Sequence, residues 1–202
     1  MPSVRFLALG DSYTIGEGVQ PAERWPVQLA ARLTRDGVTV EPPEIIAATG
    51  WTTAELEAAI DRSEAAGPYD LVSLLIGVNN QYRGLSIETY ATEFERLLKR
   101  AVGFTRSGAG QVIVLSIPDW GVTAFAEGRD RGGIATKIDE FNRVVRAACE
   151  RSRVAFVDVT AASREAGVAA DMLAADGLHP SARQYALWAG LALPPAKQAL
   201  RL

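Results

Sequence analysis

Short apolar runs alternate with longer amphipathic stretches along this chain. Five of the runs are rich in valine, isoleucine or leucine, and they mostly lack the polar alternation of a strand with one face in water. We predict them as strands over Val4–Leu9, Val38–Ala47, Leu71–Ile76, Val112–Ile117 and Val154–Val159. Buried strands separated by helices are typical of a parallel sheet, so the pattern predicts an α/β fold.

Between the strands, apolar residues recur at intervals of three and four positions, as they do on one face of a helix. We predict helices over Trp25–Arg35, from Thr52 to near Gly67-Pro68, over Ile87–Val102, over Ile134–Cys149, and from Ser181 toward Leu193. Thr52 and Ser181 each have a glutamate or glutamine three residues later, the spacing of a capping box. Pro194-Pro195 is expected to interrupt the last helix, because proline lacks a backbone N–H donor.

Polar, glycine-containing segments follow the first three predicted strands, and another lies beyond the fifth. These segments are Gly10–Gly18, Thr49–Trp51, Gly77–Asn80 and Asp176–Pro180. In open parallel sheets, ligands bind beyond the carboxyl ends of the strands. We therefore expect the four segments to converge on one edge of the sheet and to form a binding site there.

Three residues of these segments suit nucleophilic catalysis. Ser12 follows a buried strand, where a tight turn at Gly10 would present its hydroxyl. A serine is a poor nucleophile until a base accepts its proton, and His179 is the only histidine in the chain. Asp176 precedes the histidine by three residues, close enough for its carboxylate to accept the Nδ1 proton. The sequence thus predicts a catalytic triad of Ser12, His179 and Asp176.

Acyl transfer also needs hydrogen-bond donors for the oxyanion that forms during the reaction. Gly50 allows the backbone to approach a substrate closely because it has no Cβ. Asn79 supplies a neutral amide NH2, which does not compete as a base. With the backbone N–H of Ser12, these residues predict an oxyanion hole of three donors.

In this arrangement the chain resembles the SGNH hydrolase family, also called GDSL esterases and lipases. Four blocks match in order: Gly10-Asp11-Ser12 with Gly16, Gly50, Gly77-Val78-Asn79, and Asp176-Gly177-Leu178-His179. The resemblance implies the same nucleophile, oxyanion donors, acid and base, on a three-layer α/β/α, flavodoxin-like sandwich. Two positions depart from the family pattern: Tyr13 stands where leucine is common, and Asn80 stands where aspartate commonly follows the asparagine.

Several of these residues also have structural interpretations. Ser12 and Asn79 are residue types that often cap helices. Asp176 could be a loop residue, with Asp171 or Asp158 as the acid of the triad, although neither has the same spacing to the histidine. These alternatives stay open at the level of the sequence.

Three further features of the sequence have structural interpretations. Asp11 is interpreted as a structural loop carboxylate, and Cys149 as a small buried apolar residue without a function. The long segment Pro118–Gly133 contains Trp120 and Phe125, and it is either a wall or lid over the site or a plain surface loop.

Composition narrows the class of protein. The chain has 202 residues, of which 48% are hydrophobic, and this predicts one globular domain over residues 1–202. A net charge of -3 argues against a nucleic-acid partner. The single cysteine, the lack of a secretory signal and the lack of a membrane-length apolar run predict a cytoplasmic protein without an integral membrane segment. One histidine excludes a metal site of several imidazoles, and no cofactor is expected.

Together, these observations predict a serine hydrolase that cleaves carboxylic esters, with short acyl groups favoured, through an acyl-enzyme. Its partner would be a small-molecule ester, and the sequence does not predict the oligomeric state. An acyltransferase, a thioesterase, a lysophospholipase or a carbohydrate acetylesterase are alternatives on the same site. A noncatalytic domain that binds a small molecule is the alternative from a different class.

Overall fold

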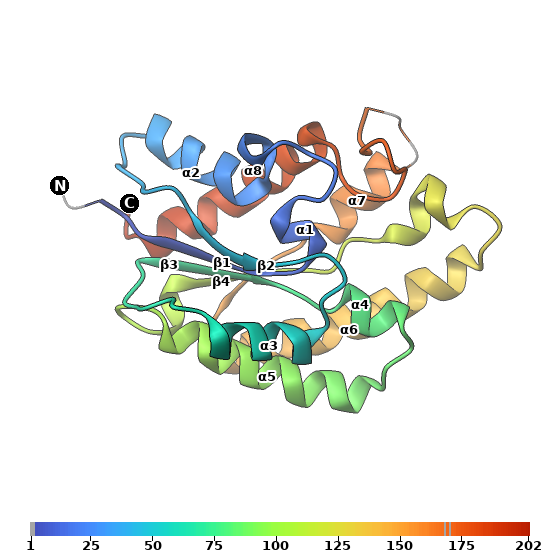
Figure 1. The fold of residues 1–202 in the computed structure, drawn as a ribbon, viewed down its shortest axis with the longest axis horizontal. Helices are drawn as coiled ribbons and strands as arrows, with labels where there is room; N and C mark the ends of the chain where they lie inside the picture. Colours follow the sequence, from blue (N-terminus) through green and yellow to red (C-terminus); the bar gives the residue numbers. More distant parts are fainter. Residues whose placement is uncertain (1–2, 168, 170) are drawn as a thin grey trace.

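The computed structural model describes residues 3–167, 169 and 171–202. Among these residues, five strands form one parallel sheet in the order β2-β1-β3-β4-β5 (Figure 1). The strands are β1 (Phe6–Gly10), β2 (Glu44–Ala47), β3 (Leu71–Leu75), β4 (Val112–Leu115) and β5 (Ala155–Val157). This is the flavodoxin-like order. The chain adds β2 on one side of β1 and then crosses to add β3, β4 and β5 on the other side, so the order of the strands switches between β1 and β3. The predicted α/β/α fold with a five-stranded parallel sheet is confirmed.

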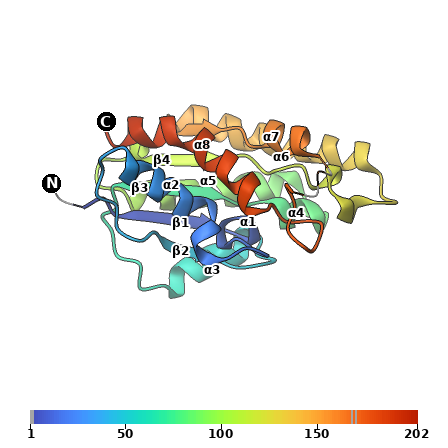
Figure 2. The ribbon, with the colours of Figure 1, turned by 90° about the horizontal axis from the view of Figure 1, so that it is seen from above.

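Helices cover both faces of the sheet (Figures 1 and 2). Helices α2 (Trp25–Arg35) and α8 (Ala182–Ala199) pack together on one face. The other face is covered by α3 (Thr53–Arg62), α5 (Ile87–Gly103) and α6 (Arg131–Ser152). In the part of the chain that the structure describes, no helix combines the length and the apolar character needed to cross a bilayer.

Short helices follow three of the strands, and none of them was predicted. They are α1 (Ser12–Ile15) after β1, α4 (Val78–Tyr82) after β3 and α7 (Thr160–Ala166) after β5. Single turns of 3-10 helix occur at η1 (Pro21–Glu23), η2 (Ala109–Gln111), η3 (Trp120–Val122) and η4 (Ala124–Ala126). These elements are too short to show a helical period in the sequence. Two of them, α1 and α4, carry candidate site residues.

The core fixes the points from which the site loops depart. Every residue of β1, β3 and β4 is buried. Trp25 of α2 and Trp188 of α8 are completely buried, as is Phe94 of α5. Burying a large apolar side chain contributes about 1.5–3 kcal/mol, so the carboxyl ends of β1 and β3 are held firmly in the sheet.

Some predicted boundaries were wrong. The second strand begins at Glu44 instead of Val38, because Pro42 and Pro43 cannot donate to a neighbouring strand. Upstream of the prolines, only an isolated bridge between Val40 and Val4 is formed. The helix that begins after Thr52 ends at Arg62, several residues before the predicted end near Gly67-Pro68.

The prediction that Pro194-Pro195 interrupts the last helix was also wrong, since α8 continues through both prolines to Ala199. Around the prolines, its buried face consists of alanines, which lie on both sides of them: Ala189, Ala192, Ala196 and Ala199. This packing continues beyond the prolines and compensates for the two lost backbone hydrogen bonds. The carbonyl that the Pro194 ring approaches belongs to Gly190, which has no side chain.

Candidate active site

Ser12 lies in a tight turn between β1 and α1. Asp11 is the N-cap of α1, and Gly16 ends the helix in the left-handed conformation at φ 73°. A Cβ on Gly10 would clash with Thr14 Oγ1 and would lie 2.5 Å from the Leu75 carbonyl oxygen. Only glycine fits at this position, because Thr14 and the Leu75 carbonyl approach its Cα closely. The turn places Ser12 at the carboxyl end of β1.

Asp11 is completely buried beneath this turn. Its Oδ1 accepts a hydrogen bond of 3.0 Å from the Tyr13 backbone N–H, and its Oδ2 has no partner among the described residues. Burial raises the pKa of Asp11 to about 7, although the hydrogen bonds from backbone N–H groups oppose this shift. A capping role agrees with the structural interpretation of this carboxylate.

Replacing Asp11 by asparagine is expected to stabilise the protein above pH 7. Folded Asp11 holds a proton between pH 3.8 and about 7, whereas the unfolded chain releases it, so this residue's contribution to stability declines as pH rises through that window. The asparagine side chain keeps the capping oxygen and does not ionise. The gain above pH 7 should be a few kcal/mol, since one pKa unit corresponds to about 1.4 kcal/mol.

Urea unfolding from pH 4 to pH 8 would measure this effect as the difference between Asp11→Asn and the wild type. Asp61, which pairs with Arg100 on the surface, provides the control Asp61→Asn. For that variant we expect a change under about 0.5 kcal/mol at every pH. An Asp11→Asn difference that stays constant across the range would show that Asp11 does not titrate there.

His179 and Asp176 form a compact unit in the loop before α8. His179 Nδ1 lies 2.6 Å from Asp176 Oδ2, and Asp176 Oδ1 accepts hydrogen bonds of 2.9 Å from the backbone N–H groups of Leu178 and His179. Partial burial favours the neutral acid, but the hydrogen bonds from the His179 side chain and the two N–H groups outweigh burial and lower the pKa of Asp176. The carboxylate is thus held in its charged form against the imidazole.

The two aspartates considered as alternative acids of the triad pair with arginines instead. Asp158 pairs with Arg146 at 3.3 Å, and Asp171 pairs with Arg183. Of the three aspartates, only Asp176 contacts the imidazole. The geometry therefore favours Asp176 as the partner of His179.

Gly50 and Asn79 approach the same place from the second and third loops. Gly50 has φ 85°, a conformation that favours glycine. Asn79 is in the first turn of α4, and its Nδ2 donates a hydrogen bond of 2.9 Å to the Trp51 carbonyl oxygen. One of the two amide hydrogens of Asn79 thus holds the second loop, and the other is left for a ligand.

Ser12, Gly50, Asn79 and His179 line one cavity of about 190 Å³. Asp176 is not among its lining residues and reaches it only through His179. The predicted convergence of the four loops on one edge of the sheet is confirmed. The cavity combines a hydroxyl, an oriented imidazole and amide groups, which is what acyl transfer requires.

Asn80, the departure from the family pattern, connects two helices. It is completely buried, its Oδ1 accepts from the Thr53 N–H at 3.0 Å, and its Nδ2 donates to Thr53 Oγ1 at 2.7 Å. An ionised aspartate can only accept hydrogen bonds, so the amide adds a donor that aspartate lacks. Asn80 thereby fixes α4 to the start of α3 and does not line the cavity.

Aromatic and apolar side chains form the rest of the cavity wall. They are Tyr13, Val78, Tyr82, Trp120, Phe125 and Leu178, and the polar Thr49 completes the lining. Arg129 lies over three of these rings, 4.7 Å from the centroid of Phe125, 5.7 Å from Trp120 and 5.9 Å from Tyr82. Tyr82 was not predicted; its position three residues after Asn79 was the available signal, since α4 places both at the site.

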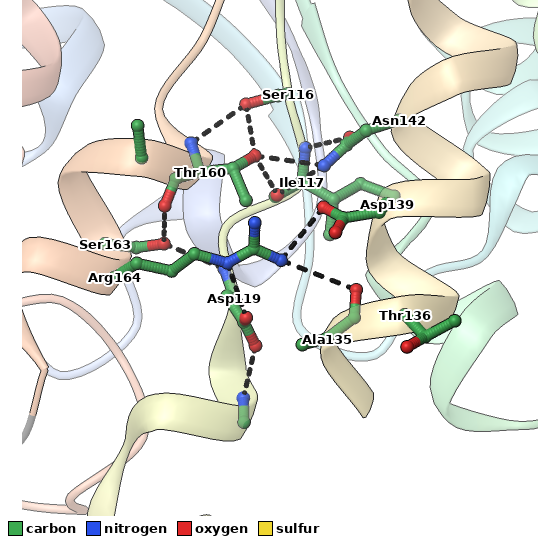
Figure 3. Close-up of polar contacts among 12 residues, drawn as sticks. Ser116, Ile117, Asp119, Ala135, Thr136, Asp139, Asn142, Thr160, Ser163 and Arg164 are labelled. Carbon is green, nitrogen blue, oxygen red and sulfur yellow. Dashed lines mark hydrogen bonds and ion pairs between the residues drawn. The ribbon is translucent and has the colours of Figure 1, made fainter. Parts of the chain in front are cut away.

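The segment Pro118–Gly133 is a wall of the site and not a plain surface loop. Figure 3 shows how its first residues are anchored. The Asp119 N–H donates to Ser163 Oγ at 2.8 Å, and Asp119 Oδ2 accepts from Arg164 Nε at 2.8 Å. Arg164 also donates to Asp139 of α6 at 2.9 Å. These contacts fix the start of the segment to α6 and α7.

The same network includes Ile117, two residues after the end of β4. Thr160 Oγ1 donates to the Ile117 carbonyl oxygen at 2.8 Å, and Asn142 Oδ1 accepts from the Ile117 N–H at 2.8 Å (Figure 3). Further along, the Phe125 N–H donates to the Gly177 carbonyl oxygen at 3.1 Å. The wall is therefore attached both to the sheet edge and to the loop that carries Asp176 and His179.

Comparison with known proteins agrees with this geometry. The model of the GDSL-like lipase/acylhydrolase family matches residues 8–187. An acetylxylan esterase from Geobacillus stearothermophilus is 27% identical over 141 residues, which cover 66% of this chain and 62% of that relative.

Solved structures share the fold. A lipolytic protein of the G-D-S-L family from Veillonella parvula DSM 2008 has a TM-score of 0.76 at 18% identity, and the match covers 95% of this chain and 97% of that one. The structure of Axe2, an acetylxylan esterase from Geobacillus stearothermophilus, has a TM-score of 0.75 at 20% identity and covers 96% and 94%. Because the family match spans most of its length, the chain belongs to the GDSL-like lipase/acylhydrolase family of ester-bond hydrolases.

Proposed function

We propose that this protein hydrolyses carboxylic esters with short acyl groups through an acyl-enzyme on Ser12. The observation that carries the proposal is the contact of 2.6 Å between His179 Nδ1 and Asp176 Oδ2, on a histidine that lines one cavity with Ser12. A carboxylate at Nδ1 fixes the tautomer in which Nε2 is free to accept a proton. A histidine with a merely structural role would not need this arrangement beside a serine.

In the first half of the reaction, Ser12 Oγ attacks the ester carbonyl carbon while His179 Nε2 takes the serine proton. The carbonyl oxygen becomes an oxyanion, which accepts hydrogen bonds from the N–H groups of Ser12 and Gly50 and from Asn79 Nδ2. The C–O bond to the alcohol then breaks, and His179 gives its proton to the leaving oxygen. Asp176 stabilises the imidazolium throughout.

In the second half, water attacks the acyl-enzyme while His179 accepts a proton from it. The bond to Ser12 Oγ breaks, the carboxylic acid leaves, and the proton returns to Ser12. No group outside the chain is needed beyond water and the ester. An acyltransferase would follow the same steps with an alcohol in place of water, so competing alcohols and product analysis separate the two activities.

The cavity favours small acyl groups. Its volume of about 190 Å³ lies below the roughly 300–1,000 Å³ of pockets that enclose drug-sized ligands. The similarity to an acetylxylan esterase favours, as a second candidate, acetyl esters of a carbohydrate. The cytoplasmic location and the lack of a nucleic-acid partner stay predictions.

Hydrolysis of p-nitrophenyl esters from acetate to decanoate tests the proposal, together with acetate release from acetylated xylooligosaccharides. We expect the highest kcat/KM at the short end of the series. Mass spectrometry after a fluorophosphonate probe should place the adduct on Ser12. A protein that hydrolyses none of these esters and takes no label would favour the noncatalytic binding domain.

Replacing Phe125 by alanine is expected to shift the preference toward longer acyl chains. The ring is 39% exposed and lines the cavity, so its removal adds space without opening the core. Each further methylene that becomes buried should raise kcat/KM by about fourfold, since it contributes about 0.8 kcal/mol. The measurement is kcat/KM across the same ester series.

Leu191→Ala on α8 is the matched control, because Leu191 is 44% exposed and does not line the cavity. We expect its chain-length profile to coincide with that of the wild type. If Phe125→Ala and Leu191→Ala gave the same profile, Phe125 would not limit the acyl group.

A further inference from the structure

Four consecutive residues that follow β2 are each held by a different side chain. The Gly50 carbonyl oxygen accepts from Arg83 at 2.5 Å, and the Trp51 carbonyl oxygen accepts from Asn79 at 2.9 Å. The Thr52 N–H donates to Glu55 at 2.7 Å, and the Thr53 N–H donates to Asn80 at 3.0 Å. Three of the four side chains come from α4 or its C-cap, residues 79, 80 and 83. At three of these four residues, the loop that contains Gly50 is thus held by α4 or its C-cap, and at Thr52 it is held by Glu55 of α3.

Arg83 is the member of this set that acts on Gly50 itself. It is the C-cap of α4, and the two residues are 33 positions apart in the sequence. The same guanidinium lies 3.4 Å from Glu55 Oε2, the oxygen that accepts the hydrogen bond from the Thr52 N–H. The hydrogen bond from the Thr52 N–H, with smaller contributions from Thr52 Oγ1 and Arg83, lowers the pKa of Glu55 against the effect of desolvation. Glu55 is therefore charged at neutral pH and keeps the guanidinium beside Gly50.

Gly50 needs such a restraint more than any other donor of the site. The N–H of Ser12 is fixed by α1, and the side chain of Asn79 is fixed by its bond to Trp51. Gly50 has no side chain, is outside a helix or strand and has a positive φ, so its own backbone torsions constrain it least. A charged donor on its carbonyl oxygen holds the peptide that follows Gly50, and this restrains the Gly50 torsions that orient the preceding peptide, which carries the Gly50 N–H.

We infer that Arg83 is a positioning residue for the oxyanion hole, which it serves by holding the Gly50 carbonyl. The inference rests on the proposed function, since it assigns Gly50 as an oxyanion donor. Arg83 does not line the cavity and contacts no reacting atom. Its effect should appear in the transition state, where the oxyanion is formed, and not in the binding of the ester.

The test compares Arg83→Met and Arg83→Lys with Arg96→Met. Arg96 of α5 pairs with Glu57 of α3 at 2.8 Å, and its side chain is 50% exposed against 46% for Arg83, so it is a matched surface arginine. Loss of a complete oxyanion donor lowers kcat by about 10²–10³-fold, and a misplaced donor should lose part of this. We expect a fall in kcat of about tenfold for Arg83→Met, with KM within twofold.

Arg83→Lys keeps a cation in reach of the carbonyl and should restore part of kcat, whereas Arg96→Met should match the wild type. A trifluoromethyl ketone, which forms an oxyanion adduct with a serine, should lose affinity for Arg83→Met by the same factor as kcat. The corresponding methyl ketone, which stays largely unattacked, should bind equally well to both proteins. Amide hydrogen exchange of Gly50 and Trp51 should be faster in Arg83→Met only.

The outcomes separate the inference from the proposed function. Arg83 is not a positioning residue if kcat of Arg83→Met stays within twofold of kcat of Arg96→Met, or if KM rises at constant kcat. Either result would leave the proposed esterase activity unaffected. Unchanged exchange of the Gly50 amide would overturn the inference whatever the activity. Exchange that is faster in the buried strands β1 and β3 to the same degree as at Gly50 would also overturn it, because the loss of kcat would then come from poor folding. A wild-type protein that hydrolyses no ester and takes no fluorophosphonate would overturn both.

Discussion

Replacing Ser12 by alanine is expected to lower kcat for ester hydrolysis by about 10⁶-fold, the loss typical of a serine nucleophile in a triad. Alanine cannot form the acyl-enzyme, and in the proposed reaction His179 and Asp176 act only in forming and hydrolysing that intermediate. Initial rates with p-nitrophenyl acetate at saturating concentration give kcat for both proteins.

The fold should not be affected by this change. Ser12 Oγ makes no hydrogen bond to another described residue, and alanine is tolerated at the first position of α1. We expect the free energy of unfolding to change by less than about 1 kcal/mol. Residual activity within tenfold of the wild type, or a fluorophosphonate adduct on Ser12→Ala, would show that another residue is the nucleophile.

Replacing Asp176 by asparagine is expected to lower kcat by about 10⁴-fold. The amide NH2 of asparagine can donate to Nδ1 and so favours the tautomer with the proton on Nε2, which cannot accept the proton of Ser12. Because Asp176 does not line the cavity, KM should stay within a few-fold of the wild-type value. The measurement is kcat and KM with the same ester.

Asp171→Asn and Asp158→Asn are the controls, since both residues were alternative acids and both pair with arginines on the surface. Each should keep kcat within about twofold, because an exposed ion pair contributes little. A large loss in either control, with an active Asp176→Asn, would assign the acid of the triad to that residue instead.

The local parts of the fold and the site follow from short stretches of sequence. Buried strands appear as apolar runs, and the spacing of Asp176 and His179 is sufficient for one loop to bring them into contact. Gly10 is required by contacts with Thr14 and Leu75, yet the glycine itself already indicated a tight turn. Such features need only a few neighbouring residues, so a single sequence predicts them.

Features that depend on distant residues could not be predicted. Phe125 and Tyr82 share one cavity only because the wall segment and helix α4 meet at the sheet edge. The prolines of α8 have the same local preferences as helix-breaking prolines elsewhere, and only the packing of the alanines around them decides the outcome. Nothing in the sequence distinguishes Arg83 from other arginines, because its partner Gly50 lies 33 positions away.

The hydrogen bond from the Phe125 N–H to the Gly177 carbonyl oxygen restricts how the substrate range of this protein can change. Gly177 lies between Asp176 and His179, so an insertion or deletion that moves the wall also pulls on His179, the proposed general base. Side-chain substitutions at Phe125, Tyr82 or Trp120 leave this backbone bond in place. Divergence or engineering toward new esters should therefore replace the rings of the cavity wall by larger or smaller side chains while the length of the wall segment stays constant. Replacing the whole segment by one of another length should lower turnover for every substrate at once.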